Sequence, residues 1–286
     1  MPMSPYRLPD AFLENLLRDD SPCGDATTFA LGIGAKPGRL IFKARQQMVL
    51  CGSEEARRLG ELRDLRLVGS LRESGSALAA GDEILRLEGA AANLHVVWKT
   101  AQTLIEYLSG IASSTAQLVA AARRGDARAA VVCTRKNFPG TKAAAIKAVL
   151  CGGGAAHRLG LSETLLVFAE HRIFAREETP VSMIAKLRRQ WPERVVVVEV
   201  DSEDEARVWI DSGADILQLE KMSVDAVERL VAYATACASA TRMAAAGGVN
   251  VDNAQAYAAA GALTLVTSAP YFAPPRDVAV TLESSL

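Results

Sequence analysis

The sequence predicts an α/β protein that consists of an N-terminal α/β sandwich domain and an incomplete, six-stranded α/β barrel. Two observations predict this fold class. The first hundred residues alternate apolar and polar side chains between glycine-rich turns, as the strands of a sandwich do. The remainder repeats short apolar strands and amphipathic helices, which predicts a parallel sheet curled into a barrel with fewer strands than a complete one.

The sandwich domain is predicted over residues 1–110. Residues 39–50 alternate in the manner of a half-buried antiparallel strand, and glycines separate the shorter segments that follow. A short apolar stretch at 277–282 is typical of one further strand. We expect it to return to the first domain, so that residues 271–286 belong with it.

The barrel is predicted over residues 111–270, after a long helix that begins near Asn93. One apolar stripe runs along that helix and consists of Leu94, Val97, Ala101, Leu104, Ile105 and Leu108. Strands are expected near 130–134, 165–169, 195–200, 215–219, 242–245 and 264–268. Amphipathic segments such as 203–212 and 252–260 are expected to form helices between them.

Composition narrows the class of function. The net charge is −1 and no basic run stands out, so we expect no nucleic-acid partner. Apolar runs such as 195–198 are interrupted by charge long before they could span a bilayer, and residues 1–13 show no secretory signal. We therefore expect no membrane partner and a cytoplasmic location. The five cysteines contain no C-x-x-C pair, which argues against a disulfide framework and a structural zinc site.

Candidate functional residues follow the predicted strands, because the working residues of a barrel lie at the carboxyl ends of its strands. In chain order they are Arg135 and Lys136, His157 and Arg158, Glu199, Glu220, Gly247 and Gly248, and Ser268 and Ala269. Each also has a structural explanation. The basic pair could lie on the surface, the histidine could make a structural hydrogen bond, the acids could form salt bridges, and the glycines could end a helix or turn the chain.

Taken together, these residues predict a divided site. Cations on the early strands suit a carboxylated ring, and the Gly247–Gly248 turn before a helix suits a phosphate group. The acids between them suit Mg2+, which is commonly held by carboxylates together with substrate phosphates. Two anionic substrates and magnesium indicate a reaction in which pyrophosphate leaves.

Four sequence motifs resemble those of the quinolinate phosphoribosyltransferase family. They are LRDDSPCGDATT at 17–28, LSGIAS at 108–113, TRKNFPGTK at 134–142 and CGGGAAHRLGL at 151–161. The resemblance covers nearly the whole chain, and the Thr-Arg-Lys and Gly-Gly-Gly…His-Arg blocks are specific to the family. It implies a type II phosphoribosyltransferase architecture and transfer of ribose 5-phosphate from phosphoribosyl pyrophosphate (PRPP) to the ring nitrogen of quinolinate or an analogue. Pyrophosphate would be released, with CO2 as well if quinolinate is the acceptor, to give nicotinate mononucleotide.

The resemblance also implies roles for individual residues and a head-to-tail homodimer, with possible further assembly. Substrate-binding residues would be Arg135, Lys136, His157, Arg158, Phe168 and, reaching the site of the partner subunit, Lys99. Lys136, Glu199 and Glu220 would be catalytic, and the two glutamates would serve the ribose and Mg2+. Gly247, Gly248, Ser268 and Ala269 would bind the 5-phosphate.

The chain departs from the family pattern in ways that change charge or size. Lys99 replaces an arginine, Phe168 a lysine, Glu220 an aspartate, Lys221 an asparagine, Ala244 a glutamate and Ala246 a serine, and Phe272 stands near the place of a histidine. Truncating a buried charge partner typically costs about 2–5 kcal/mol, so a substrate with one fewer negative group or a different ring suits the Phe168 site better. This pattern resembles the ModD-type pyrophosphorylases associated with molybdate transport.

Two other functions stay open on the sequence. A phosphosugar isomerase or aldolase would need a Schiff-base lysine or a carboxylate base at a strand end, and no compelling candidate is visible. A non-catalytic ligand-binding relative linked to molybdate handling would accommodate Phe168 and Ala246. The sequence offers no dedicated cage for molybdate itself.

Overall fold

The computed structural model describes residues 7–285, and the chain divides into two compact units. The first unit contains the described residues up to 116 together with 138–153 and those from 270 onward, and the second contains 117–137 and 154–269. Residues 1–6 and 286 lie outside the described residues. Residues 1–6 are the start of the predicted sandwich domain, where we expected no signal sequence, and residue 286 is the end of the segment predicted to return to that domain. The predicted boundary at residue 110 falls inside one long helix, α4 (Ala91–Gly125), whose two ends belong to different units.

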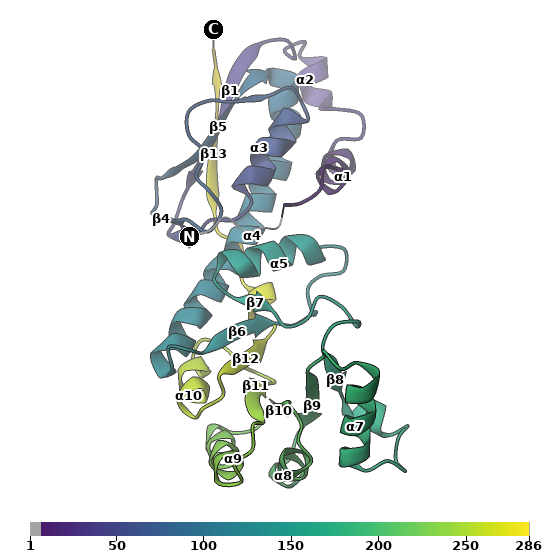
Figure 1. Ribbon diagram of the computed structural model, residues 1–286. Helices are drawn as coiled ribbons and strands as arrows, with labels where there is room; N and C mark the ends of the chain where they lie inside the picture. The colour runs from purple at the N-terminus through teal and green to yellow at the C-terminus, as the bar shows by residue number, and fades with distance from the viewer. Residues whose placement is uncertain (1–6, 286) are drawn as a thin grey trace. The chain divides into compact units, whose positions relative to one another are not determined.

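The first unit is built on a four-stranded antiparallel sheet (Figure 1). The strand order is β13 (Val278–Ser284), β1 (Pro37–Ala44), β5 (Glu83–Ala90) and β3 (Arg66–Leu67), and a short ribbon pairs β2 (Met48–Val49) with β4 (Ala77–Leu78). The accompanying helices are α1 (Asp10–Asp20), α2 (Ala26–Ala30), α3 (Ser53–Glu61), α5 (Lys142–Cys151) and the 3-10 turn η1 (Ala269–Phe272). The C-terminal strand pairs with β1, as expected for the segment that returns to this sheet.

Apolar side chains of β1, β5 and α4 form the core of the first unit. Leu40 and Phe42 of β1 are fully buried, as are Val97 and Ile105 from the predicted stripe of the long helix. The prediction of one continuous strand over 39–50 was wrong. β1 ends at Ala44 because both of its partners begin opposite this point, β13 at Val278 and β5 at Glu83, and β2 then pairs separately with β4.

The second unit is built on a parallel sheet that curls into a half-barrel, so the predicted fold class is confirmed. Its strand order is β7 (Ala155–Ala156), β6 (Ala130–Cys133), β12 (Thr264–Thr267), β11 (Arg242–Ala246), β10 (Ile216–Glu220), β9 (Val196–Val200) and β8 (Leu165–Val167). The sheet has seven strands instead of six. The additional strand, β7, is two residues long and too short to give an apolar pattern in the sequence.

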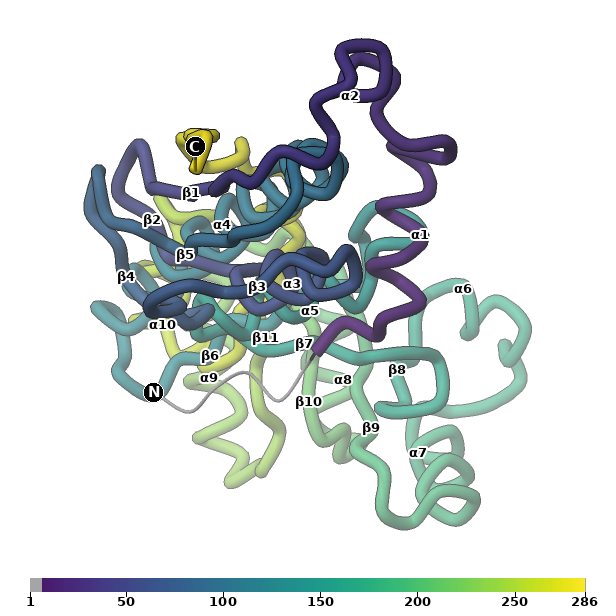
Figure 2. The backbone as a smooth tube through the Cα atoms, turned by 90° about the horizontal axis from the view of Figure 1, so that it is seen from above, coloured from purple at the N-terminus to yellow at the C-terminus, as the bar shows by residue number. Residues whose placement is uncertain are grey.

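Helices cover the outer face of this half-barrel. They are α7 (Pro180–Gln190), α8 (Glu203–Asp211), α9 (Val224–Ala236) and α10 (Ala254–Ala259), and α7 lies beside β8 and β9 in both views of the chain (Figures 1 and 2). The short helix α6 (Ala169–Arg172) follows the carboxyl end of β8. Ser202 and Ser223 cap α8 and α9 by accepting hydrogen bonds from backbone N–H groups of the first turn.

Side-chain alternation along the strands separates the two faces of the half-barrel. Val198 and Leu219 point to the helices and are buried in a large apolar cluster. Glu199, Gln218 and Glu220 alternate with them and therefore lie on the inner face. The strand alternation thus directs polar groups into the half-barrel.

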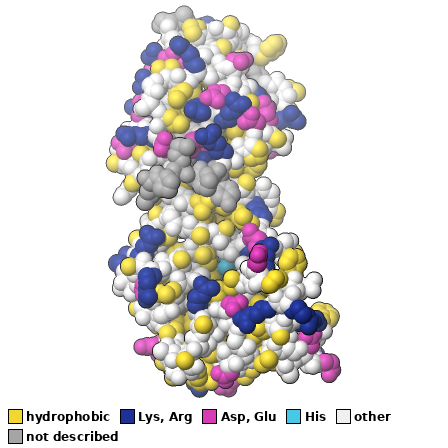
Figure 3. Space-filling model, in the orientation of Figure 1, with side chains coloured by type: hydrophobic (Ala, Val, Ile, Leu, Met, Phe, Trp, Pro, Cys, Tyr) yellow, Lys and Arg dark blue, Asp and Glu magenta, His cyan; other side chains and the backbone are white. Residues whose placement is uncertain are grey.

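The surface of the chain carries mixed charge. On the face shown in Figure 3, basic and acidic side chains are interspersed over both units. No helix within residues 7–285 combines the length and the apolar character that a bilayer span requires.

Candidate active site

A cavity of about 800 Å³ opens at the carboxyl ends of the parallel strands in the second unit. Its lining comes from the ends of β6 to β12 and from the loops that follow them, as a barrel active site does. The lining residues are Thr134, Arg135, Lys136, His157, Arg158, Leu166, Phe168, Glu170, Glu199, Gln218, Glu220, Ala246, Gly247, Gly248, Val249, Asn250, Val266, Thr267, Ser268 and Ala269.

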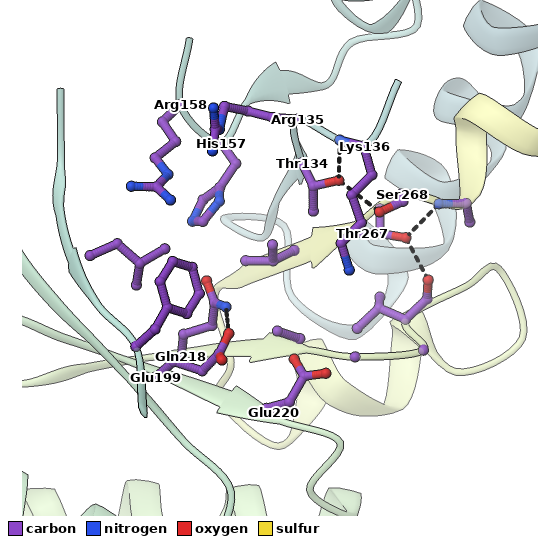
Figure 4. A pocket seen from close by; sticks show the side chains of 18 of the residues that line it. Thr134, Arg135, Lys136, His157, Arg158, Glu199, Gln218, Glu220, Thr267 and Ser268 are labelled. Carbon is purple, nitrogen blue, oxygen red and sulfur yellow. Dashed lines mark hydrogen bonds between the residues drawn. The ribbon is translucent and has the colours of Figure 1, made fainter. Parts of the chain in front are cut away.

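One side of the cavity is basic. Arg135 and Lys136 follow β6, while His157 and Arg158 follow β7, and Figure 4 shows the Lys136 side chain extending into the cavity. Burial lowers the pKa of Arg158 from its usual value, and the nearby guanidinium of Arg135 lowers it further. Burial and the charge of Arg158 also lower the pKa of His157, so its imidazole is neutral at pH 7 and can donate only one ring N–H.

The middle of the cavity is acidic. Glu199 lies on β9 and Glu220 at the end of β10. Burial raises the pKa of Glu199, the carboxylate of Glu220 raises it further, and a hydrogen bond from Gln218 Nε2 at 2.5 Å acts in the opposite direction. Beyond Glu220, Lys221 adopts a left-handed backbone conformation with φ 55°, and its Nζ lies 4.0 Å from Glu220 Oε1.

A glycine turn forms another wall of the cavity. Gly247 and Gly248 have φ values of 77° and 92°, which L side chains rarely adopt. A Cβ atom at Gly247 would lie only 2.6 Å from Glu220 Oε1, so both conformation and space favour glycine there. The side-chain amides of Asn250 and Asn253 donate to the Gly248 carbonyl and hold the turn in place.

Hydroxyl groups fix the two strand ends next to this turn. Thr134 Oγ1 and Ser268 Oγ lie 2.7 Å apart, and Thr267 Oγ1 donates to the Val249 carbonyl at 2.6 Å (Figure 4). The Ala269 N–H in turn donates to Thr267 Oγ1. This network holds the ends of β6 and β12 and the loop after β11 together.

Phe168 separates this cavity from a second, more apolar one. The Arg158 guanidinium lies over the Phe168 ring at 5.5 Å from its centre, and His171 stacks on the ring at 5.8 Å. The second cavity, of about 640 Å³, shares Arg135, Arg158 and Phe168 with the first and extends between β8 and α7. Phe168 therefore gives this wall an aromatic surface beside the Arg158 guanidinium.

All predicted site residues except Lys99 line the one cavity. Lys99 lies on α4 in the first unit, where its Nζ sits over the Trp98 ring at 4.5 Å and donates to Gln102 Oε1. The predicted helix after the glycine turn begins only at Ala254, so the turn is not the first turn of that helix.

Gln218 and Glu170 also line the cavity, and neither was predicted from the sequence. A glutamine in the middle of the apolar strand ILQLE was the visible signal for Gln218, because a polar side chain in a buried strand needs a partner.

The two carboxylates at the centre fit Mg2+. Glu220 raises the pKa of Glu199, and a cation would remove the repulsion that this shift reflects. Mg2+ is usually bound through one or two carboxylates together with substrate phosphates and water. The described part of the chain contains no group of three or more His, Cys, Asp or Glu side chains that could hold a metal ion.

Comparison with known proteins agrees with this geometry. Residues 25–109 match the N-terminal domain and residues 111–281 the C-terminal domain of quinolinate phosphoribosyl transferase. The chain is 42% identical to ModD of Rhodobacter capsulatus, provisionally named a pyrophosphorylase, over 87% of this chain and 95% of that protein. It is 31% identical to the carboxylating nicotinate-nucleotide pyrophosphorylase of Mycobacterium leprae, over 66% of this chain and 65% of that protein.

The fold comparison points the same way. The crystal structure of NadC from Streptococcus pyogenes superimposes with a TM-score of 0.87 and 27% identity, covering 96% of each chain. Matches to both domains, in the expected order, together span nearly all of the sequence. The chain therefore belongs to the quinolinate phosphoribosyltransferase family, whose members are pentosyltransferases.

Proposed function

We propose that the chain transfers ribose 5-phosphate from PRPP to the ring nitrogen of a carboxylated heteroaromatic acceptor and releases pyrophosphate. One observation carries the proposal. A single cavity presents Arg135 and Arg158 at one wall, the Gly247–Gly248 turn at another, and two carboxylates between them. This arrangement suits two anionic substrates that meet at a ribose carbon.

The phosphate end of PRPP fits the glycine turn. Without side chains at 247 and 248, the backbone can approach a phosphate closely, and the Ser268 hydroxyl lies at the adjacent strand end. Lys136 reaches into the cavity as a mobile point charge, which suits the pyrophosphate group. As the C1–O bond to pyrophosphate breaks, pyrophosphate takes the electron pair and Lys136 offsets the added negative charge.

The carboxylates suit the ribose. Glu199 and Glu220 can accept hydrogen bonds from the ribose hydroxyls and stabilise the positive charge that develops on the sugar ring. Mg2+ held by the same two residues would supply charge compensation for the pyrophosphate. No covalent nucleophile is needed, because orientation and electrostatic stabilisation can provide the rate enhancement.

The acceptor carboxylate fits the basic wall. Arg135 and Arg158 can hold it while the ring nitrogen, with its lone pair, forms the new bond to C1 of the ribose. If quinolinate is the acceptor, the carboxylate beside the ring nitrogen then leaves as CO2, and the carbon retains the electron pair and takes a proton from solvent. The neutral ring of His157 beside Arg158 adds one hydrogen-bond donor to this wall.

We also propose that the active form is a homodimer in which Lys99 of each subunit serves the site of the other. Lys99 is exposed and lines a separate cavity of the first unit together with Asp20, Asp25 and His95. In its present position the Lys99 ammonium contacts only Gln102 and the Trp98 ring among the contacts resolved for residues 7–285, so it remains available to an anionic ligand.

Pyrophosphate release tests the proposed function. The protein is incubated with PRPP, Mg2+ and a series of pyridine carboxylates, and we expect release only when an acceptor is present. Arg158→Met should raise the KM for the acceptor by about tenfold or more, since a hydrogen bond to a charged group contributes about 1.5–3 kcal/mol. Arg194→Met is the matched control, because Arg194 lies outside this cavity, over the Trp191 ring. PRPP binding without release, whichever acceptor is added, would instead indicate a non-catalytic ligand-binding protein.

A further inference from the structure

Among the described side chains that line the cavity, only Gln218 has a buried polar atom without a hydrogen-bond partner. Its side chain is 5% exposed, and its Oε1 atom is buried without a hydrogen-bond partner. Its Nε2 donates to Glu199 Oε2 at 2.5 Å. Because an ionised carboxylate only accepts hydrogen bonds, this contact fixes the nitrogen toward Glu199 and leaves the oxygen for another donor.

The strand register places Gln218 next to the acceptor side of the cavity. Gln218 on β10 pairs with Glu199 on β9, and Val167 on β8 pairs with Val198, so Phe168 follows in the same row as Glu199. On the other side, Gln218 pairs with Ala244, whose methyl group offers no donor. Figure 4 shows the Gln218 amide at the cavity with its nitrogen toward Glu199. A donor for Oε1 is therefore not supplied by the neighbouring strands.

The charges around this position disfavour a second ligand carboxylate. Glu199 and Glu220 lie beside Gln218, and Glu170 lies close enough to raise the pKa of Glu199 as well. The wall at Phe168 is an aromatic ring that already carries the Arg158 guanidinium on its face. Arg135 and Arg158 can compensate one carboxylate, but a second one directed at Gln218 would face the amide oxygen of Gln218 and the carboxylates of Glu199 and Glu220. The cation whose charge reaches Glu199 is Lys136, which the proposed transfer assigns to the pyrophosphate.

We propose that Gln218 selects the acceptor by accepting a hydrogen bond from it. The acceptor is then an aromatic monocarboxylate that carries a neutral hydrogen-bond donor, such as a carboxamide, where quinolinate has its second carboxylate. This inference rests on the proposed phosphoribosyl transfer and specifies its acceptor. Rotation about the outer torsion of the side chain, which is broad in glutamine, would expose Oε1 to such a donor. The new hydrogen bond would then have to offset a weaker contact between Nε2 and Glu199.

The two monoamides of quinolinate provide a matched test, because each replaces one carboxylate by a carboxamide of nearly the same size. Calorimetry with the full chain, in the presence of PRPP and Mg2+ and in their absence, compares both monoamides with quinolinate. We expect one monoamide to bind about tenfold more tightly than quinolinate, which corresponds to about 1.4 kcal/mol. Tighter or equal binding of quinolinate overturns the inference, and so does the absence of binding by both monoamides.

Gln218→Met is the decisive variant, since methionine keeps the length of the side chain and removes the amide. We expect it to abolish the preference for the monoamide, and the accompanying loss of PRPP affinity through the lost contact with Glu199 should be smaller than the loss of monoamide affinity. Gln190→Met, on the exposed end of α7, is the control and should keep the preference. An equal loss of affinity for PRPP and acceptor would assign Gln218 a structural role through Glu199 and overturn the inference.

The test separates failure of this inference from failure of the proposed function. A monoamide preference that depends on Gln218, without pyrophosphate release from any acceptor, supports the assignment of Gln218 and contradicts phosphoribosyl transfer. Pyrophosphate release that is fastest with quinolinate and unchanged in Gln218→Met supports the transfer and overturns the assignment of Gln218.

Discussion

At the scale of single residues, Phe168 determines the charge of the cavity wall at which we expect the acceptor to bind. Its ring lines the cavity beside Arg158, so this part of the wall carries one positive charge fewer than a lysine there would give. We predict that Phe168→Lys increases the affinity for quinolinate by about tenfold or more, because hydrogen bonds to charged groups contribute about 1.5–3 kcal/mol. Calorimetry with quinolinate measures the change.

A matched lysine elsewhere controls for general electrostatic attraction. Phe174 is 89% exposed and lines neither cavity, so Phe174→Lys adds the same charge without reaching the acceptor. Equal gains in the two variants would show that net charge, and not the position of residue 168, governs quinolinate binding.

Protonation of Glu199 makes the stability of the folded protein depend on pH. Burial and Glu220 raise the pKa of Glu199 above its usual value, so the folded state holds this proton more tightly than the unfolded chain. Protonated Glu199 therefore stabilises the folded protein at pH values below the unfolded pKa. This contribution is lost as the pH rises through the folded pKa. We predict that Glu199→Gln has a higher Tm than the unsubstituted protein at pH 7 without ligands and loses this advantage near pH 4, measured by thermal unfolding across that range.

Glu203 supplies a control of opposite sign. A hydrogen bond from Arg229 lowers the pKa of Glu203, so its contribution is present at neutral pH and is lost as pH falls through its folded pKa. Glu203→Gln should therefore lower the Tm at pH 7. A Glu199→Gln variant that is also less stable at pH 7 would contradict the electrostatic strain assigned to Glu199.

The individual charged residues of the site were predictable from the sequence, whereas the role of Gln218 was not. Arg135, Lys136 and Glu199 follow apolar runs that predict strands. A barrel places its working residues at the carboxyl ends of its strands, so these positions could be selected from the sequence. The proposed role of Gln218 depends on its contact with Glu199, which lies 19 positions away in the chain. The register of β10 on β9 brings the two side chains together. Pairing of strands at that separation depends on tertiary packing and leaves no local sequence pattern.

The loop that follows β11 shows at the element scale why a turn was predictable and the first residue of the following helix was not. Gly247 and Gly248 mark positive φ values that only glycine adopts readily. The helix was expected from residue 252, yet asparagine side chains hold the loop in an irregular turn until α10 starts at Ala254. Side-chain hydrogen bonds of this kind compete with helix formation.

Gly247→Ala tests the phosphate turn. A left-handed alanine costs about 1–2 kcal/mol, and its Cβ would approach Glu220 Oε1, so we predict a loss of unfolding free energy of at least about that size. The affinity for PRPP should fall by about tenfold or more, because the displaced turn can no longer approach the phosphate. Denaturant unfolding and PRPP calorimetry measure the two effects.

Gly213→Ala is the matched control at the amino end of the parallel strands, away from the cavity. Gly213 has φ 84° between α8 and β10, and no heavy atom lies within 4 Å of the position of its Cβ. The variant should lose unfolding free energy through its backbone alone and keep its affinity for PRPP. If both variants weaken PRPP binding equally, the turn at 247–248 has no special part in holding the phosphate.

At the scale of the whole molecule, the alternation of strands and helices was sufficient to predict the half-barrel. Its large outer core follows from strands such as β9 and β10 that present apolar residues to helices. The grouping of α5 with the first unit was not predictable, because α5 follows β6 in the chain as a barrel helix would. Its Lys147 is buried in the first unit and forms ion pairs with Glu54 and Glu55 of α3.

The proposed homodimer predicts complementation between two inactive variants. Lys99→Ala and Arg158→Ala each disable one component of a site that two subunits would share. In a random mixture of the two, half of the dimers would be mixed and each of these would contain one intact site. We therefore expect about a quarter of the unsubstituted activity to return on mixing, because each subunit supplies its Lys99 to the site of the other. Pyrophosphate release by the mixture measures this, and an inactive mixture that still exchanges subunits would exclude the shared site.

Phosphorus NMR of PRPP tests the central claim most directly. The unsubstituted protein is mixed with PRPP, Mg2+ and a series of aromatic carboxylates that includes quinolinate and its monoamides, and the pyrophosphate signal is followed with time. We predict that free pyrophosphate appears only when a suitable acceptor is present, in equal amount to an N-ribosylated product. PRPP that stays intact with every acceptor, in a sample where calorimetry shows PRPP bound, would contradict phosphoribosyl transfer in this cavity.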